Sequence, residues 1–286
     1  MGWHGYLAMW CAAFGAVALL GYGRSLAGIT RAQRTVRVKG RIEQVREPRH
    51  GSSRHGGISV VVSYRDPSTG LEVIVTNDGE RRETVTTAWA GRGIGVHYPR
   101  GRPHAYRFTS DLQGSSRGLG RPNFAVFLIY VGLVVVAAID WGWPWALIGF
   151  GGPWAVSIAC HLPRNLRDVN RRRDTLAAMA AVQGRVIAVL KDVSTDEDGH
   201  TATTFTPVVA FTTRECTAVT AHCTSGLRDP AGSYGRDVTI HYAPDDPAVF
   251  TLDRAAERRS QGLDLAFNVL ALVVTAAAAV VGAAML

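Results

Sequence analysis

The chain has 286 residues, of which 47% are hydrophobic, and its formal net charge is +8. The apolar residues are bunched into four stretches that carry almost no charge, which argues against an ordinary soluble protein of one or two domains. The basic residues lie between these stretches. Such placement is typical of residues that flank membrane spans, so we do not expect a nucleic-acid-binding protein.

The first apolar stretch occupies residues 1–23. It is about as long as the ~20 residues that an α-helix needs to cross the hydrocarbon of a bilayer. A secretory signal peptide is the alternative, but this stretch has no Lys or Arg before its apolar run and no Ala-x-Ala-like cleavage site after it. We therefore expect a first transmembrane helix that stays attached to the chain.

Residues 36–111 predict a first β-module. Apolar residues alternate with polar ones around Val60, Val62 and Tyr64, and this period of two is typical of half-buried strands. The loop at 48–57, "PRHGSSRHGG", is rich in Gly, Ser and basic residues. It could contact an acidic group, but we interpret it as a mobile hairpin tip.

Two adjoining apolar stretches, residues 123–143 and 144–162, predict a helical hairpin with the tip "DWGWPW". Proline after two tryptophans suits a turn at the water interface, where indole rings concentrate. Four residues could break the second helix of this hairpin, as happens in transporters, although close packing or a kink is the favoured interpretation: Gly149, Gly151, Gly152 and Pro153.

Residues 180–254 predict a second β-module, and a short basic helix at 168–182 is expected to link it to the membrane. The last apolar stretch, residues 263–286, predicts a fourth transmembrane helix. Ala278 and Gly282 have the small-xxx-small spacing that favours close contact between helices.

All 31 Lys and Arg residues lie within 24–121 and 164–259. Basic residues are retained on the cytoplasmic side during insertion, so we expect both β-modules in the cytoplasm and the hairpin tip and both termini outside. Tryptophans would then gather toward the outer face: Trp3, Trp10, Trp141, Trp143 and Trp145. Arginines close to the spans are expected to contact anionic lipid: Arg24, Arg31, Arg117, Arg121, Arg164, Arg167, Arg171, Arg172, Arg173, Arg254, Arg258 and Arg259.

The two modules repeat one another. The paired blocks are residues 38–45 and 182–189, residues 59–66 and 206–213, and residues 91–108 and 235–252. The first and third pairs are shifted by 144 positions and the second by 147. We infer a duplication of one unit, a helix followed by a β-module and a second helix. The expected fold class is a membrane protein of α plus β type, with five or six short antiparallel strands per module in a barrel or sandwich.

Eight residues carry this repeat and are interpreted as structural: Gly40, Tyr64, Tyr98, Pro103, Gly184, Phe211, Tyr242 and Pro247. Gly40 and Gly184 lie inside strands, where glycine commonly permits a bulge or a close approach of backbone. Each tyrosine of the third block follows a histidine. Neighbouring strand residues face opposite sides, so we expect the tyrosine in the core and the histidine at the surface, without a catalytic role.

No catalytic, cofactor-binding or metal-binding residue is expected. Cys216 and Cys223 lack the Cys-x-x-Cys spacing of zinc sites, and a cytoplasmic setting argues against a disulfide between them. The glycine-rich "GRGIG" at 91–95 enters a predicted strand rather than a helix, which argues against a dinucleotide-binding loop.

The repeated blocks resemble the bacterial membrane-associated family called domain of unknown function 3592, in two tandem copies. The second copy has the motif residues Gly184, Arg185, Val186, Pro207, Val208, Phe211, Gly235, Val238, Tyr242, Pro244, Pro247 and Leu252. The first copy departs from the pattern, with Arg100-Gly101-Arg102 in place of Asp245-Asp246. The resemblance implies a β-rich module beside transmembrane helices and brings no established activity.

We therefore expect a multi-pass protein of a bacterial plasma membrane that is not an enzyme. Its paired modules would act in interaction or scaffolding, by binding a protein partner, each other, a second copy or the inner lipid surface. The alternative is a small transporter or channel-like assembly of oligomerised helices that depends on Asn268 or Gly152. A membrane enzyme would need polar residues that converge in one cleft.

Overall fold

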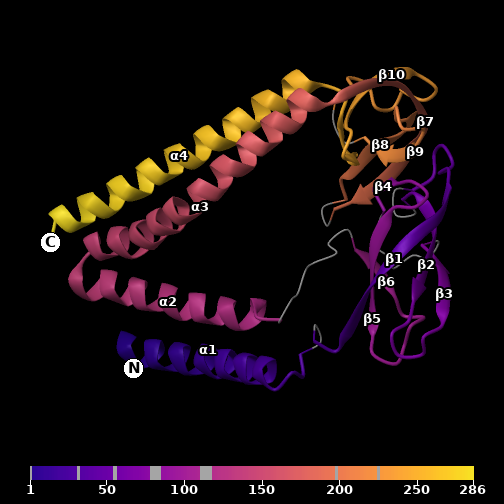
Figure 1. Cartoon of the computed structure of the whole chain (residues 1–286). Coiled ribbons are helices and arrows are strands. Elements are labelled where there is room, and N and C mark those ends of the chain that lie inside the picture. The colour runs from indigo at the N-terminus through magenta and orange to yellow at the C-terminus, as the bar shows by residue number, and fades with distance from the viewer. Residues whose placement is uncertain are drawn as a thin grey trace. The chain divides into compact units, whose positions relative to one another are not determined.

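The computed structural model describes residues 2–30, 33–53, 57–77, 85–109, 118–196, 199–223 and 226–286. Within these residues the chain forms four α-helices and eleven β-strands, and the strands make two antiparallel sheets (Figure 1). The expected α plus β class is confirmed. The chain divides into a helical unit and a β unit, which are described separately.

The helices are α1 (Trp3–Leu26), α2 (Gly120–Trp141), α3 (Pro144–Ala178) and α4 (Arg254–Ala284). In the described part of the chain, these four are long and apolar enough to cross a membrane, by length and composition. The basic linker at 168–182 is not a separate short helix, because α3 continues through Pro153 and Pro163 to Ala178. α4 likewise begins well before its apolar stretch.

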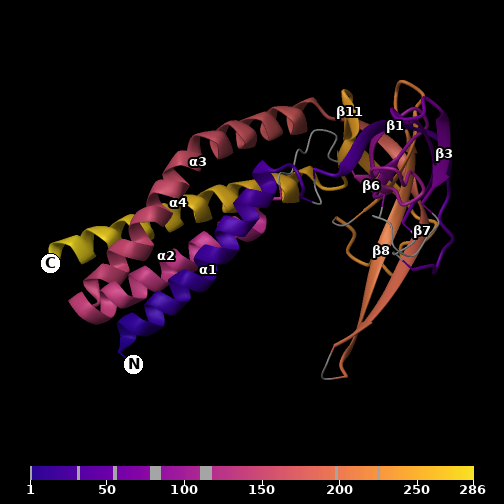
Figure 2. The same ribbon diagram turned by 90° about the horizontal axis from the view of Figure 1, so that it is seen from below.

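α1 and α2 pack antiparallel along their length, side by side in both views (Figures 1 and 2). At one end, the Tyr22 hydroxyl donates to Asn123 Oδ1 over 2.8 Å. At the other end, His4 Nε2 lies 3.1 Å from Asp140 Oδ2. The two-residue turn after α2 uses Gly142 with φ +99°, a conformation that favours glycine.

Small residues bring α3 against its neighbours. A Cβ on Gly151 would lie 2.8 Å from the carbonyl oxygen of Thr275 in α4, and one on Gly282 would lie 2.8 Å from the carbonyl oxygen of Pro144. α3 is continuous, and Gly149 and Gly151 serve close packing, whereas a Cβ on Gly152 would meet nothing within 4 Å. Since the end of α4 meets the start of α3, these two helices are also antiparallel. Both segments that contain strands consequently leave the helical unit at the same end.

The first sheet has the strand order β3-β2-β1-β5-β6. Its strands are β1 (Thr35–Arg46), β2 (Ser59–Arg65), β3 (Glu72–Thr76), β5 (Gly93–Pro99) and β6 (Arg107–Thr109). The sheet curls so that its two end strands approach each other. The Tyr106 hydroxyl, just before β6, donates to the Thr76 carbonyl of β3 over 2.5 Å. The expected barrel-like module is nearly closed here.

The second sheet has the order β11-β10-β7-β8-β9-β4. Its strands are β7 (Ala180–Thr195), β8 (Thr201–Thr212), β9 (Ala218–His222), β10 (Asp237–Ala243), β11 (Asp246–Thr251) and β4 (Thr87–Ala88). Apart from β4, each strand has the neighbours of its counterpart in the first sheet. The long β7 and β8 form a twisted ribbon that Figure 2 shows lengthwise.

The pairing register repeats with the same shifts as the sequence. Gly40 is opposite Ile94 in the first sheet, and Gly184 is opposite Val238 in the second, so both partners move by 144 positions. Each of β1 and β7 has one irregularity against its hairpin partner, between Ile42 and Gln44 and between Val186 and Ala188. The bulge thus also falls at one equivalent step.

Gly40 and Gly184 lie before these bulges and permit close approach. A Cβ on Gly40 would lie 2.7 Å from Val62 Cγ1 and 3.2 Å from the Ser63 carbonyl oxygen. A Cβ on Gly184 would lie 2.4 Å from Ile240 Cδ1 and close to a backbone oxygen of β8. Of the two roles expected for these glycines, a close approach of backbone and a bulge, they fulfil the first. The bulge occurs a few residues later.

The aromatic signature residues form equivalent pairs in the two modules. The ring centroids of Tyr64 and Tyr98 are 5.7 Å apart, and those of Phe211 and Tyr242 are 5.8 Å apart. All four rings are buried. The signature prolines lie at the sheet margins: Pro103 in the turn before β6, where its carbonyl accepts the Tyr64 hydroxyl over 3.1 Å, and Pro247 in the end strand β11.

The two modules are interlocked, which the sequence did not predict. β4 belongs to the first module but pairs with β9, with Thr87 opposite Ala221. In return, Ala188, Leu190 and Val208 of the second module complete the hydrophobic core of the first. The first core is therefore built from both modules, and the partly buried Trp89 of the first module packs against the core of the second.

The loop at 48–57 joins the antiparallel strands β1 and β2, as expected of a hairpin tip, but its described part is hydrogen-bonded to β7. The Gly51 amide donates to the Val189 carbonyl, and the Lys191 amide donates to the Ser52 carbonyl, each over 2.9 Å. The Val189 amide also donates to His50 Nδ1 over 3.1 Å. Residues 54–56 lie outside the described residues. The loop pairs with β7 beyond the point where β10 ends. Its partner is too distant in sequence to be predicted from local patterns.

The packing of α3 on α4 gives a prediction with a matched control. Gly151→Leu places a side chain against the α4 backbone and should lower the free energy of unfolding by about 1–3 kcal/mol. Gly152→Leu, where a Cβ would meet nothing within 4 Å, should change it little. Thermal or denaturant unfolding of the full chain in detergent measures both. Equal losses for the two variants would contradict this packing.

Candidate functional site

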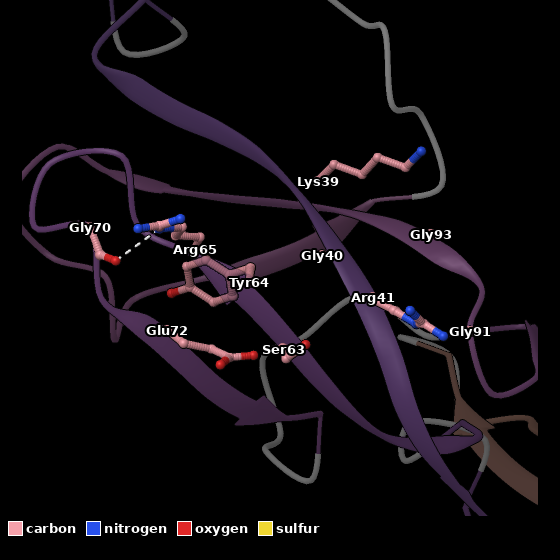
Figure 3. Close-up of a pocket in the computed structure, with 10 residues that line it drawn as sticks. All are labelled: Lys39, Gly40, Arg41, Ser63, Tyr64, Arg65, Gly70, Glu72, Gly91 and Gly93. Atoms are coloured by element: carbon pink, nitrogen blue, oxygen red, sulfur yellow. Dashed lines mark hydrogen bonds between the residues drawn. The ribbon is translucent and has the colours of Figure 1, made fainter.

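An open groove of about 750 Å³ lies on the outer face of the first sheet. Six of the residues that line it carry the argument: Lys39, Arg41, Arg65, Glu72, Gly91 and Gly93 (Figure 3). The volume falls within the range of about 300–1,000 Å³ that is usual for small-molecule sites. The groove is therefore large enough to hold a ligand of modest size.

Strand alternation places the cations in the groove. Gly40 and Ile42 face the core from β1. Their neighbours Lys39 and Arg41 therefore face outward, about 6–7 Å apart along the strand. Arg65 reaches the groove from the neighbouring β2, and its Nε donates to the Gly70 carbonyl over 3.0 Å (Figure 3). All three charged side chains are exposed.

Glycines line one wall of the groove and leave room there for the Lys39 side chain. A Cβ on Gly93 would lie 2.7 Å from Lys39 Cε, so the lysine stem runs across this residue. Gly91 has φ +89°, and its amide donates to the Ile42 carbonyl over 2.7 Å. Gly93 opens the strand β5, which agrees with rejecting a dinucleotide loop that would open a helix. The glycines instead leave backbone and cations accessible together.

A buried polar pair holds the turn beside Arg65. The Tyr98 hydroxyl donates to Asp66 Oδ1 over 2.7 Å, and Ser68 and Thr69 donate to the other carboxylate oxygen. The hydrogen bond from Tyr98 lowers the pKa of Asp66 well below its usual range, and burial raises the pKa of Tyr98. Asp66 thereby remains ionised and fixes the turn that presents the Gly70 carbonyl to Arg65.

The equivalent face of the second module has lost this charge. Lys39 corresponds to Gln183, and Arg65 corresponds to Thr212. The sheets have the same strand order and register, so the two faces differ in side chains and not in backbone pairing. The cationic groove is therefore a property of the first module.

The arginine of the groove that both copies retain, Arg41 in the first and Arg185 in the second, has a different environment in each module. Arg185, the counterpart of Arg41, lies 3.9 Å from the carboxylate of Asp237, and its Nε donates to the Gly235 carbonyl over 3.1 Å. Asp237 occupies the position of Gly93 in the first module. An acidic residue thus accompanies the arginine in the second module, where the first has a bare glycine.

Several sequence-based interpretations can be compared with the structure. Tyr98 and Tyr242 are buried, while His97 and His241 are half-buried on the opposite face of their strands, as expected. Burial lowers the pKa of His241. Cys216 is exposed in the turn after β8 and Cys223 is buried, and both are free thiols. Among the described residues, no group of three or more His, Cys, Asp or Glu side chains could hold a metal ion.

Most of the juxtamembrane arginines in the described part of the chain are exposed: Arg24, Arg121, Arg164, Arg167, Arg171, Arg172, Arg173, Arg258 and Arg259. Arg254 is half-buried, and its guanidinium donates to the Met179 carbonyl. This residue is engaged by the protein itself, which weakens the expectation that it contacts lipid. Arg31 and Arg117 lie outside the described residues.

Sequence reasoning did not select Lys39 or Arg65 as site residues. The signal that could have found them was a difference between the copies, since both are replaced by uncharged residues in the second repeat. Lys39 and Arg65 line the same groove because β1 lies between β2 and β5, and this strand order could not be read from the sequence.

No protein-family model matches the chain, and neither the curated proteins nor the solved structures include one that matches it. The resemblance to domain of unknown function 3592 therefore stays a prediction based on the repeated residues.

The buried pair predicts how stability depends on pH. Because folding lowers the pKa of Asp66, its ionised form stabilises the fold above the unfolded value of about 4, and this contribution is lost as the pH falls toward the folded value. Tyr98→Phe removes the donor, so the variant should be less stable than wild type at pH 7, by a margin that shrinks below about pH 4.

Denaturant unfolding of the full chain at several pH values measures this margin. Tyr242→Phe is the matched control, because its hydroxyl is 3.3 Å from Glu215 in the more open second module and should produce a smaller pH-dependent difference. A Tyr98→Phe margin that does not change with pH would contradict the assigned role of Asp66.

Proposed function

We propose that the protein is a multi-pass protein of a bacterial plasma membrane that acts by binding and not by catalysis. In this proposal its two β-modules form one interaction unit on the cytoplasmic side. The observation that carries it is the combination of four apolar helices with basic residues concentrated at the end where both strand-containing segments leave the helical unit.

The surface of the helices supports insertion in a bilayer. Large apolar side chains are exposed on each helix, including Leu19, Phe124, Trp154 and Phe267, the last at 71%. Exposure of so much apolar surface to water would be unfavourable by about 25 cal/mol for each Å². A lipid environment removes this cost, and extended apolar surfaces are a mark of membrane or protein contact.

The distribution of charge supports the orientation. Trp3, Trp141 and Trp143 are exposed at the end of the helical unit opposite the strand-containing segments, as in an interfacial aromatic belt. Arginines such as Arg167 and Arg258 lie toward the other ends of their helices. The positive-inside rule then favours a cytoplasmic β unit.

The β unit supports binding in preference to catalysis. Its groove joins cations with glycines, and the Ser63 hydroxyl in its lining donates to Glu43 over 2.7 Å and not to a histidine base. The transporter alternative receives little support from Asn268, whose amide donates to the Asp264 carbonyl of its own helix over 2.9 Å, or from Gly152, where a Cβ would meet nothing within 4 Å.

Single-cysteine accessibility tests the proposed topology. In a chain whose other cysteines are replaced, three reporters are compared: native Cys216 in the second module, Arg100→Cys in the β5–β6 turn of the first, and Trp143→Cys at the hairpin tip. All three positions are exposed. In spheroplasts, a membrane-impermeant maleimide should label the Trp143→Cys reporter, and it should reach the other two only after lysis.

Two results would contradict the proposal. One is labelling of the two β-module reporters from different sides of the membrane. The other is a full chain that stays monodisperse in buffer without detergent, since its helices would then not require lipid.

A further inference from the structure

We propose that the groove of the first sheet binds the phosphate group of an anionic ligand, which is either the headgroup of a phospholipid or a soluble phosphate compound. This inference deepens the proposed function, since it specifies what the β unit recognises. It rests on that proposal only for the compartment in which the ligand is met, and the binding itself requires nothing of the membrane topology.

The charge of the groove lacks compensation. Among the described residues, neither Lys39 nor Arg41 has an ion pair or a hydrogen bond from its side chain, while Arg65 uses one nitrogen on the Gly70 carbonyl. The lining includes the carboxylate of Glu72 from the far strand β3, which leaves the cations in excess. The three cations lie on neighbouring strands, with Lys39 and Arg65 pointing to different sides of the groove (Figure 3), and an anion bound on this face would offset their excess charge.

The equivalent face of the second module serves as a comparison, because it carries its own carboxylate beside the arginine. There the position of Gly93 is taken by Asp237, which lies beside the retained Arg185. A built-in carboxylate of this kind would occupy the place of an external anion. Ordinary surface charge needs no such difference between two equivalent faces, so the bare glycine of the first module favours a ligand.

The geometry fits phosphate. A guanidinium presents a planar fork of donors that matches two oxygens of a phosphate, and a lysine adds a point charge, so this set suits a group with three or more oxygens and up to two negative charges. Binding of nucleic acid bases is not favoured, because Tyr64 is the aromatic residue of the lining and its ring is buried against Tyr98.

Equilibrium binding to the purified full chain in an uncharged detergent tests the inference. Three probes are compared: inorganic pyrophosphate, short-chain dioctanoyl phosphatidic acid, and dioctanoyl phosphatidylcholine as the lipid without net charge. We expect binding of pyrophosphate, of phosphatidic acid or of both, and little binding of phosphatidylcholine. Binding of pyrophosphate alone identifies a soluble source of the phosphate, whereas binding of phosphatidic acid alone identifies a lipid.

Two variants test the groove. Lys39→Gln/Arg41→Gln/Arg65→Gln removes the cations and should weaken binding at least about tenfold. Gly93→Asp keeps every cation and introduces the acidic residue of the second module; its Cβ meets the end of the flexible Lys39 side chain, which can move aside. This variant should weaken binding by a similar factor.

The matched control, Arg185→Gln/Arg214→Gln/Arg228→Gln, removes three exposed charges from the second module and should leave the affinity within about twofold of wild type. Equal weakening by the control and the groove variants would overturn the inference, because it would mean unspecific attraction to a basic protein. Undetectable binding of every probe would overturn it as well. Either result leaves the cysteine-labelling pattern unaffected, so failure here is distinguishable from failure of the proposed topology.

Discussion

The β unit depends on one packing constraint, that the core of the first module is completed by side chains of the second. Ala188, Leu190 and Val208 are fully buried in that core, although they come from the β7–β8 hairpin. The first module returns the strand β4 to the edge of β9. Because the first core contains buried residues of both copies, the inward positions of the two modules are constrained together, and changes are more easily accommodated on the outer faces.

The restriction explains why the backbone is conserved between the copies while their outer faces differ. A Cβ on Gly40 or Gly184 would collide with the adjacent strand, so the position cannot vary without displacing the sheet. The outward positions beside these glycines meet no such limit. Lys39 in one copy and Gln183 in the other are both compatible with the same register. The chemistry of the groove could therefore change without a change of fold.

Local patterns predicted much of this structure. Long uncharged runs predicted the four helices, and a period of two predicted the strands, because hydropathy and alternation depend on neighbours in sequence. The repeat also agrees with the shared register, since β1 and β5 are shifted by 144 positions and β2 by 147 relative to their paired counterparts in the second sheet. Contacts between distant segments were not predictable in this way. The hydrogen bonds between the His50 loop and β7, and the position of Lys39 and Arg65 on adjacent strands, both depend on the order of strands in the sheets.

Hydrogen exchange of the full chain in detergent, with and without Leu190→Ala, tests the interlocked core most directly. Removing this fully buried side chain should cost about 2–5 kcal/mol. If the second module completes the first core, the amides of Val60, Val62 and Val96 in β2 and β5 should lose protection together with those of β7. Unchanged protection of β2 and β5, with loss confined to the second module, would contradict the account.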